Sequence, residues 1–190
     1  RGIGFNNTYN INQNNSISYS SSFISTKYDE KASTKAVSDD KNNDTSTGSL
    51  GYNYTFSDVN LISSKISYTR KDAKIGYNSY DGPGLNIGFT RVLPFGMLKL
   101  DKTYQKNSYR GKNENIHTVI NRQDEIETSL IQLSGRLSKL LPFLKELDPN
   151  GEIFYSLKYV EIDSESTLLN NSAIRKNTSF NIIKRISLNE

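Results

Sequence analysis

The sequence contains no cysteine and no tryptophan, and His117 is its only histidine. Without cysteine there is no disulfide scaffold and no thiolate metal site. One histidine excludes a metal site built on several imidazoles, and its polar surroundings predict an exposed loop side chain. No run of about 20 apolar residues is present, so the sequence predicts no transmembrane helix.

Patterns that support catalysis are also missing. Serines are plentiful, but we find no Ser–His–Asp arrangement, and no glycine-rich phosphate loop stands between a strand and a helix. Asp39, Asp40 and Asp44 lack the spacing of a calcium loop. We therefore expect no enzyme activity and no cofactor or metal. The 24 Lys and Arg and the 20 Asp and Glu are interspersed, which predicts no nucleic-acid surface.

The composition fits a water-soluble globule poorly. Only 34% of the residues are hydrophobic and the mean hydropathy is −0.63, which would leave a thin core. Yet the chain has 12 Tyr and 8 Phe, and disordered chains are usually poor in aromatic residues. A transmembrane β-barrel reconciles these observations, because only every second strand residue has to be apolar.

Apolar and polar residues alternate with a period of two along most of the chain, as in a strand with two unlike faces. Leu50, Tyr52, Tyr54 and Phe56, for example, alternate with Ser49, Gly51, Asn53 and Thr55. We expect the apolar set to contact lipid. Its candidate members are Ile17, Tyr19, Phe23, Leu50, Tyr52, Tyr54, Phe56, Leu85, Ile87, Phe89, Leu98, Leu100, Ile153, Tyr155, Leu157, Tyr159, Phe180, Ile182, Ile186 and Leu188.

Charged residues between these positions are candidates for the lumen or rim of a barrel. They are Lys65, Lys99, Asp101, Asp124, Glu125, Glu127, Lys158 and Arg185. Lys102 and Lys184 instead fall in phase with apolar residues. In the middle of a bilayer each would cost about 2–4 kcal/mol, so we expect them near an interface or in protein contacts.

The segment 123–137 breaks the alternation. Ile126 and Leu130 lie on one phase, whereas Ile131, Leu133 and Leu137 lie on the other. A β-bulge would account for the change of phase. Leucines from Leu137 to Leu147 then follow helical spacing, which permits a short helix before Pro149 if Pro142 falls in its first turn.

The connections alternate in length. Short turns near 12–15, 57–60 and 93–96 alternate with long polar loops near 29–47, 71–83, 107–122 and 164–176, and a medium connection spans 140–151. In an up-and-down meander the long loops share one end, as in outer-membrane barrels. We expect one all-β domain over 1–190, an antiparallel up-and-down transmembrane β-barrel in the bacterial outer membrane. Long loops would be extracellular and the C-terminus periplasmic. About nine strands are present, which suggests part of a larger barrel.

Several motifs resemble one known family. They are the stretch Tyr80–Phe89, the turn Leu93-Pro94-Phe95-Gly96, the strand start Leu98-Lys99-Leu100 and the segment Arg122–Ile126. Together with the last strand they resemble the C-terminal barrel domain of the surface lipoprotein assembly modifier family, over residues 80–190.

That resemblance implies a barrel preceded by a periplasmic helical-repeat domain, which assists delivery of lipoproteins or other protein cargo to the cell surface. The implied partners are outer-membrane lipid, such cargo and the barrel-insertion machinery. The family supplies no catalytic residues. The chain ends Leu188-Asn189-Glu190, without the terminal aromatic residue of many outer-membrane barrels.

Three alternatives stay open. A passive or polysaccharide-exporting porin would conduct ions steadily. An adhesin-like β-sandwich would be soluble without detergent. A barrel enzyme would need a catalytic group that the sequence does not reveal.

Overall fold

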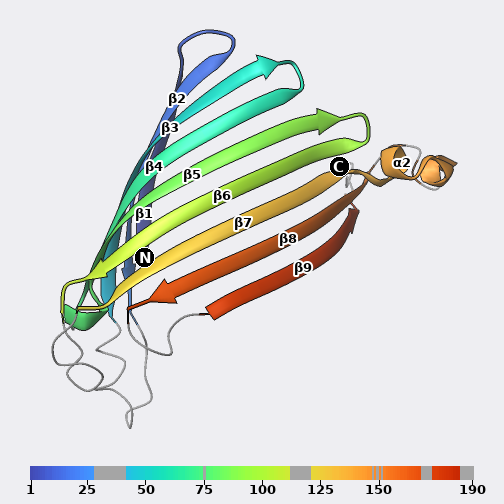
Figure 1. The fold of residues 1–190 in the computed structure, drawn as a ribbon. Coiled ribbons are helices and arrows are strands. Elements are labelled where there is room, and N and C mark those ends of the chain that lie inside the picture. Colours follow the sequence, from blue (N-terminus) through green and yellow to red (C-terminus); the bar gives the residue numbers. More distant parts are fainter. Residues whose placement is uncertain are drawn as a thin grey trace.

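The computed structural model describes residues 1–27, 42–74, 76–111, 121–146, 148, 150, 152–167 and 173–184. The chain forms one curved antiparallel sheet, in which β1 and β2 turn behind β3–β5 (Figure 1). The strands are β1 (Gly2–Asn10), β2 (Asn15–Thr26), β3 (Asn43–Ser57), β4 (Asn60–Ala73), β5 (Tyr80–Leu93), β6 (Gly96–Tyr109), β7 (Gln123–Arg136), β8 (Ile153–Ser166) and β9 (Ala173–Lys184).

The sheet has nine strands in the order β1-β2-β3-β4-β5-β6-β7-β8-β9, so each strand pairs with its neighbours in sequence. This confirms the predicted all-β, antiparallel up-and-down architecture. Within the described residues β1 and β9 each have one unpaired side, so the sheet is open there.

Connections of different kinds lie at the two ends of the sheet. At one end, called the turn end, are the turns 11–14, 58–59 and 94–95, and the helical connection between β7 and β8. The opposite end, called the loop end, carries connections 27–42, 74–79, 110–122 and 167–172. The strands reach further into the loop end than predicted: β3 already begins at Asn43 and β5 at Tyr80. In the β3 extension, Asn43, Thr45, Ser46 and Thr47 pair with β2 and β4 although they lack hydrophobic alternation.

The predicted bulge in the segment 123–137 is wrong. β7 pairs with β6 and β8 without a register shift, and the one irregularity of β3 and β4 lies between Thr55 and Ser57. The phase change has a simpler cause, because Ile126 and Leu130 lie on the face that is polar elsewhere. Leu130 there faces Val160 of β8, so this face becomes partly apolar in the last strands.

The short helix permitted by the leucine spacing is present as two pieces, α2 (Leu137–Leu140) and the 3-10 helix η2 (Pro142–Glu146). Pro142 begins η2, where a missing N–H leaves no broken helical bond. Asp148 then accepts hydrogen bonds from the backbone N–H groups of Glu152 (2.7 Å) and Ile153 (3.2 Å), which positions the start of β8.

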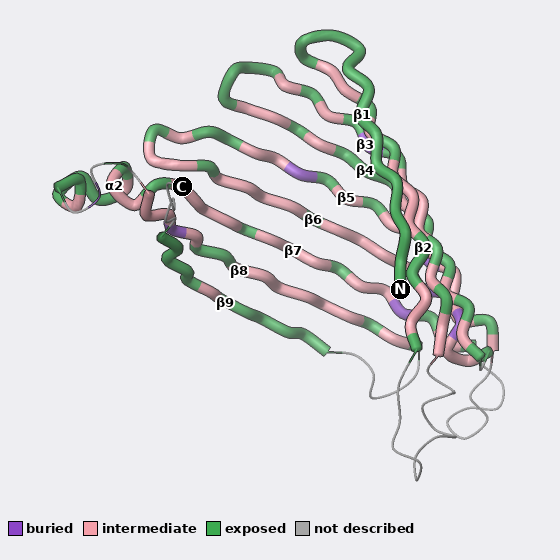
Figure 2. The backbone as a smooth tube through the Cα atoms, turned by 180° about the vertical axis from the view of Figure 1, so that it is seen from behind, coloured by how far each residue is buried: buried purple, intermediate pink, exposed green. Residues whose placement is uncertain are grey.

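The structure has almost no hydrophobic core. Tyr155, 2% exposed, is the one buried hydrophobic residue in the described part of the chain. Along β2–β5, exposed and half-buried residues alternate (Figure 2). Most large apolar residues of these strands are exposed, whereas most of their small polar neighbours are half-buried or buried. Side chains crowd on the concave surface of a curved sheet and spread apart on the convex one, so the polar row occupies the concave face.

Candidate functional surfaces

The apolar face is continuous across the strands. Directly paired residues of neighbouring strands share a face, and Tyr19, Leu50, Ile66, Leu85 and Tyr104 form one such cross-strand row over β2–β6. Tyr19, Leu50 and Ile66 are 49%, 50% and 58% exposed. In water this surface would far exceed the apolar patches that soluble monomers expose.

Every described residue of the predicted lipid-facing set lies on this apolar face, Phe56 by its ring contact with Phe89 and the others by register. Ile186 and Leu188 lie outside the described residues. Tyr155 needs a correction, because its side chain is buried rather than exposed. Its ring lies against Gly96 and Gly135, where a Cβ on Gly135 would come 3.2 Å from the Tyr155 Cε1 atom. Two glycines on adjacent strands leave room for the ring to lie flat on the sheet.

The apolar residues form an oblique band, which we call the apolar band. The row that contains Leu50 and Leu85 continues to Glu127 of β7 and Asp163 of β8. On β8 the apolar residues Ile153–Tyr159 lie closer to the turn end. The band thus shifts by about one residue per strand, which at ~3.4 Å per residue and ~4.8 Å between strands corresponds to strands tilted by about 35–40°. Transmembrane barrels have strand tilts of this size.

Charges on the apolar face lie mainly on the loop-end side of the band. Lys106 Nζ lies 2.8 Å from Glu125 Oε1, and Lys102 Nζ lies 2.5 Å from Glu127 Oε2. The sequence predicts Glu125 and Glu127 at the lumen or rim, and the register places both on the apolar face near its loop-end rim, so the lumen alternative does not fit them. Within β7 they point to the same side as Ile131, which lies on the apolar face. Each glutamate forms an ion pair with a lysine of β6. The two ion pairs therefore mark the loop-end edge of the apolar band without leaving unpaired charges there.

The polar face is built from small side chains. Its hydrogen bonds include Ser20 Oγ with Ser49 Oγ (2.6 Å), Thr47 Oγ1 with Thr69 Oγ1 (3.2 Å) and Asn86 Nδ2 donating to Thr103 Oγ1 (2.7 Å). Glycines leave space for these polar side chains to lie close to the backbone of the neighbouring strand. A Cβ at Gly84, for example, would come 2.6 Å from the Ser67 hydroxyl. Hydroxyls and amides of this density require water or a polar partner, since burial in an apolar medium would strand them.

Five of the predicted lumen or rim charges lie on the polar face by register. They are Lys65, Lys99, Asp101, Asp124 and Lys158; Arg185 lies outside the described residues. Lys71, Arg136 and Arg175 lie there too and were missed in the sequence, although their parity relative to the apolar residues identifies them. Lys99 Nζ lies 3.0 Å from the largely buried Asp101 Oδ2, an oxygen that accepts no hydrogen bond within the described residues.

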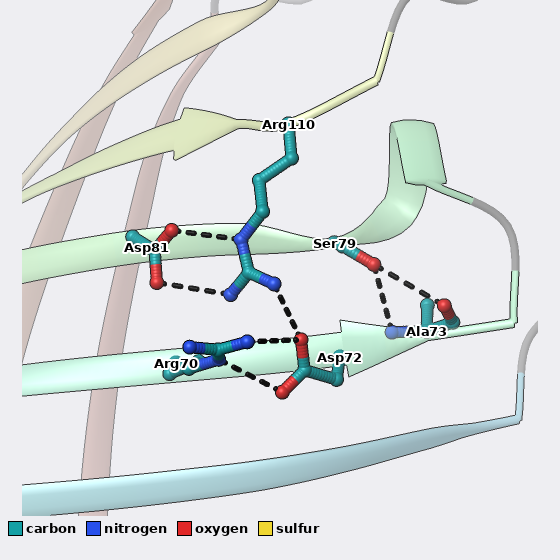
Figure 3. Close-up of polar contacts among 6 residues, drawn as sticks. All are labelled: Arg70, Asp72, Ala73, Ser79, Asp81 and Arg110. Carbon is teal, nitrogen blue, oxygen red and sulfur yellow. Dashed lines mark hydrogen bonds and ion pairs between the residues drawn. The ribbon is translucent and has the colours of Figure 1, made fainter.

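A charged clasp joins strands at the loop end (Figure 3). Arg110, just after β6, donates from Nε and Nη2 to both carboxylate oxygens of Asp81 (2.8 and 3.0 Å) and from Nη1 to Asp72 (2.5 Å). Arg70 donates to the same Asp72 carboxylate (2.9 Å). These two carboxylates raise the pKa of Arg110 above its ordinary value. The clasp holds the ends of β4, β5 and β6 together; sequence spacing did not reveal it.

A second group at the loop end secures β7. Arg122 donates to Asp124 from Nε at 2.8 Å, and this hydrogen bond raises the pKa of Arg122. The guanidinium carbon lies 4.6 Å from the centroid of the Tyr109 ring, which also packs on Tyr80 at 5.3 Å. Arg110 and Arg122 thus anchor both strand ends that flank the 110–122 connection.

No helix among the described residues is both long and apolar enough to span a membrane. The described ranges also contain no group of three or more His, Cys, Asp or Glu side chains that could hold a metal ion. His117 lies outside them. No known family model matches the chain, and no curated protein matches it. The resemblance to the surface lipoprotein assembly modifier family therefore stays a prediction.

Proposed function

We propose that this sheet forms part of the wall of a transmembrane β-barrel in the bacterial outer membrane, and that the barrel provides a polar path for cargo. The apolar band contacts lipid and the polar face lines the interior. In this arrangement the short connections face the periplasm and the long ones the outside of the cell, as in outer-membrane barrels. The sheet acts by shape and polarity, without covalent chemistry.

One observation carries the proposal: the large apolar side chains are more exposed than the small polar ones behind them. Burial of one large apolar side chain contributes about 1.5–3 kcal/mol. Transfer of the whole band into hydrocarbon therefore contributes on the order of tens of kcal/mol. A second sheet packed on the band would do the same, but the strand tilt inferred from the slanting band favours lipid.

Cell fractionation tests the membrane location. We expect the protein in the outer-membrane fraction, released only by detergent, and with a gel mobility that changes on boiling. A soluble protein whose mobility is the same before and after boiling would refute the proposal in favour of a β-sandwich.

For the cargo, we propose lipoproteins or other proteins that the barrel helps to reach the cell surface. The family resemblance and the open, hydroxyl-rich polar face support this. Deletion of the gene should reduce the surface exposure of lipoproteins to added protease while their total amount stays constant. Unchanged exposure of all surface lipoproteins would contradict it.

A passive or polysaccharide-exporting porin is the second candidate, and the predominance of lysine and arginine on the polar face favours it. The porin would be supported by two results together. The purified protein would conduct steadily in planar bilayers, and the deletion strain would display its lipoproteins normally.

A further inference from the structure

We propose that the polar face selects for anions, with Lys65, Lys99 and Lys158 forming a basic girdle at mid-height of the wall. This inference rests on the proposed function, because it assigns the polar face to a water-filled interior. The ligand class is small anionic solutes and the anionic groups of cargo that pass along this face.

The first evidence is the separation of charge between the two faces. Among the described strand residues, the polar face carries the cations Lys65, Lys71, Lys99, Arg136, Lys158 and Arg175, but only the carboxylates Asp101 and Asp124. On the apolar face the carboxylates outnumber the cations. Positive and negative charges are mixed along the sequence. Because alternate strand residues point to opposite sides of the sheet, most of the carboxylates in this count fall on the apolar face, and the polar face keeps more cations than carboxylates.

The second evidence is that three of the excess cations lack partners among the described residues. Asp101 lies beside Lys99 and Asp124 beside Arg122. Lys65, Lys158 and Arg175 have no ion pair or hydrogen bond from their side chains to any other described residue, and all three are exposed. Their charges are free to attract an anion from water.

The third evidence is the height of the three lysines in the wall. Lys65 precedes Ile66, Lys99 lies between Leu98 and Leu100, and Lys158 lies between Leu157 and Tyr159. Each lysine thus lies on the polar face directly behind residues of the apolar band. In the proposed barrel this is the level at which the wall crosses the hydrocarbon layer.

The lysines occupy alternate strands, β4, β6 and β8. Lys99 and Lys158 share one cross-strand row with Gln132 between them, which separates their Cα atoms by about 10 Å, two strand spacings. Rings of Lys or Arg are the device by which pores favour anions and phosphate groups. The low-dielectric wall behind the girdle strengthens its field.

Because residues 1–190 contain no cysteine, a single reporter thiol can be placed in this wall, in proteoliposomes that hold the complete protein with any cysteine outside these residues replaced by serine. A reporter thiol is introduced as Q132C, between Lys99 and Lys158, and its rates of reaction with an anionic and a cationic methanethiosulfonate reagent are compared. We expect the anionic reagent to react roughly tenfold faster, relative to the ratio for free cysteine, because a charged wall concentrates the opposite ion. K65Q/K158Q in the same background should abolish most of this preference.

The matched control is K176Q/K184Q, which removes the same charge from the apolar face and should leave the preference unchanged. A preference for the cationic reagent, an equal effect of both double variants, or no reaction with either reagent would overturn the inference. Failure of the proposed function would appear separately, as a soluble protein without heat-modifiable mobility. A heat-modifiable membrane protein without anion preference would contradict the girdle alone.

Discussion

The Tyr155 hydroxyl on β8 donates a 3.1 Å hydrogen bond to the main-chain carbonyl of Phe95, in the turn between β5 and β6. The ring reaches that carbonyl by passing over Gly135 of β7 and Gly96 of β6. One side chain therefore joins β8 to the β5–β6 turn across two intervening strands. Tyr155 is the one buried hydrophobic side chain among the described residues, so this contact takes the place of a core.

Removal of this side chain should destabilise the turn end. We expect Y155A to lower the free energy of unfolding by about 3–5 kcal/mol, as for other large aromatic residues. Y155F, which loses only the hydrogen bond, should cost about 1 kcal/mol. Urea unfolding in detergent micelles measures both. Y19F, at an exposed tyrosine, is the control. Equal stability of Y155A and the wild type would show that the contact contributes nothing.

Neighbouring residues on opposite faces should respond differently to the same charge. L50K places an ammonium group in the apolar band and should cost about 2–4 kcal/mol of folding free energy in bilayers, depending on depth. S49K places it on the polar face, where it also removes the hydrogen bond to Ser20, and should cost only about 1 kcal/mol. Folding into lipid vesicles, followed by heat-modifiable mobility, compares the two. The face assignment fails if S49K is the more damaging change.

The loop-end clasp should order the connection between β4 and β5. R110A removes the hydrogen bonds to Asp72 and Asp81 and leaves two carboxylates close together, so we expect faster amide hydrogen exchange in residues 72–81. The exchange of residues 96–101, far from the clasp, should stay the same.

R91A is the matched control for the clasp, because Arg91 lies at the turn end and has no ion pair within the described residues. If R91A and R110A gave the same exchange pattern, or R110A gave none, the clasp would have no ordering role.

The pair of Lys102 and Glu127 locates the edge of the apolar band. Their side chains are 55% and 48% exposed. If the edge lies at this pair, as the register indicates, water and head groups screen it and a double-mutant cycle should give a coupling energy below about 1 kcal/mol. The variants are K102M, E127Q and their combination, measured by folding in bilayers. A coupling of several kcal/mol would place the pair inside hydrocarbon and shift the band toward the loop end.

Much of the fold was visible in the sequence because a strand has a period of two. The alternation around Leu50–Phe56 and Ile153–Tyr159 identified strands and their faces without knowledge of any partner. Turn residues such as Pro94 and the polar loop segments separated one strand from the next. The orientation of Lys65, Lys99 and Lys158 followed from the same parity.

Register and packing could not be read in this way. The sequence left Glu125 and Glu127 open between lumen and rim, since a local charge cluster carries no information about which residue it will oppose. Only the register, which places Glu125 opposite Lys106 and Glu127 opposite Tyr104, showed that both lie on the apolar face. The burial of Tyr155 depended on two glycines from other strands, Gly96 and Gly135, which are distant in sequence.

Strands with one apolar and one polar side could be predicted from the chain alone, because alternation is a property of each segment and needs no partner. How the strands align was visible only in the folded sheet: the slant of the apolar band, the Arg110 clasp and the cross-strand row shared by Lys99 and Lys158. Each of these depends on hydrogen-bonded register between strands, and register is set by the whole sheet rather than by any single segment.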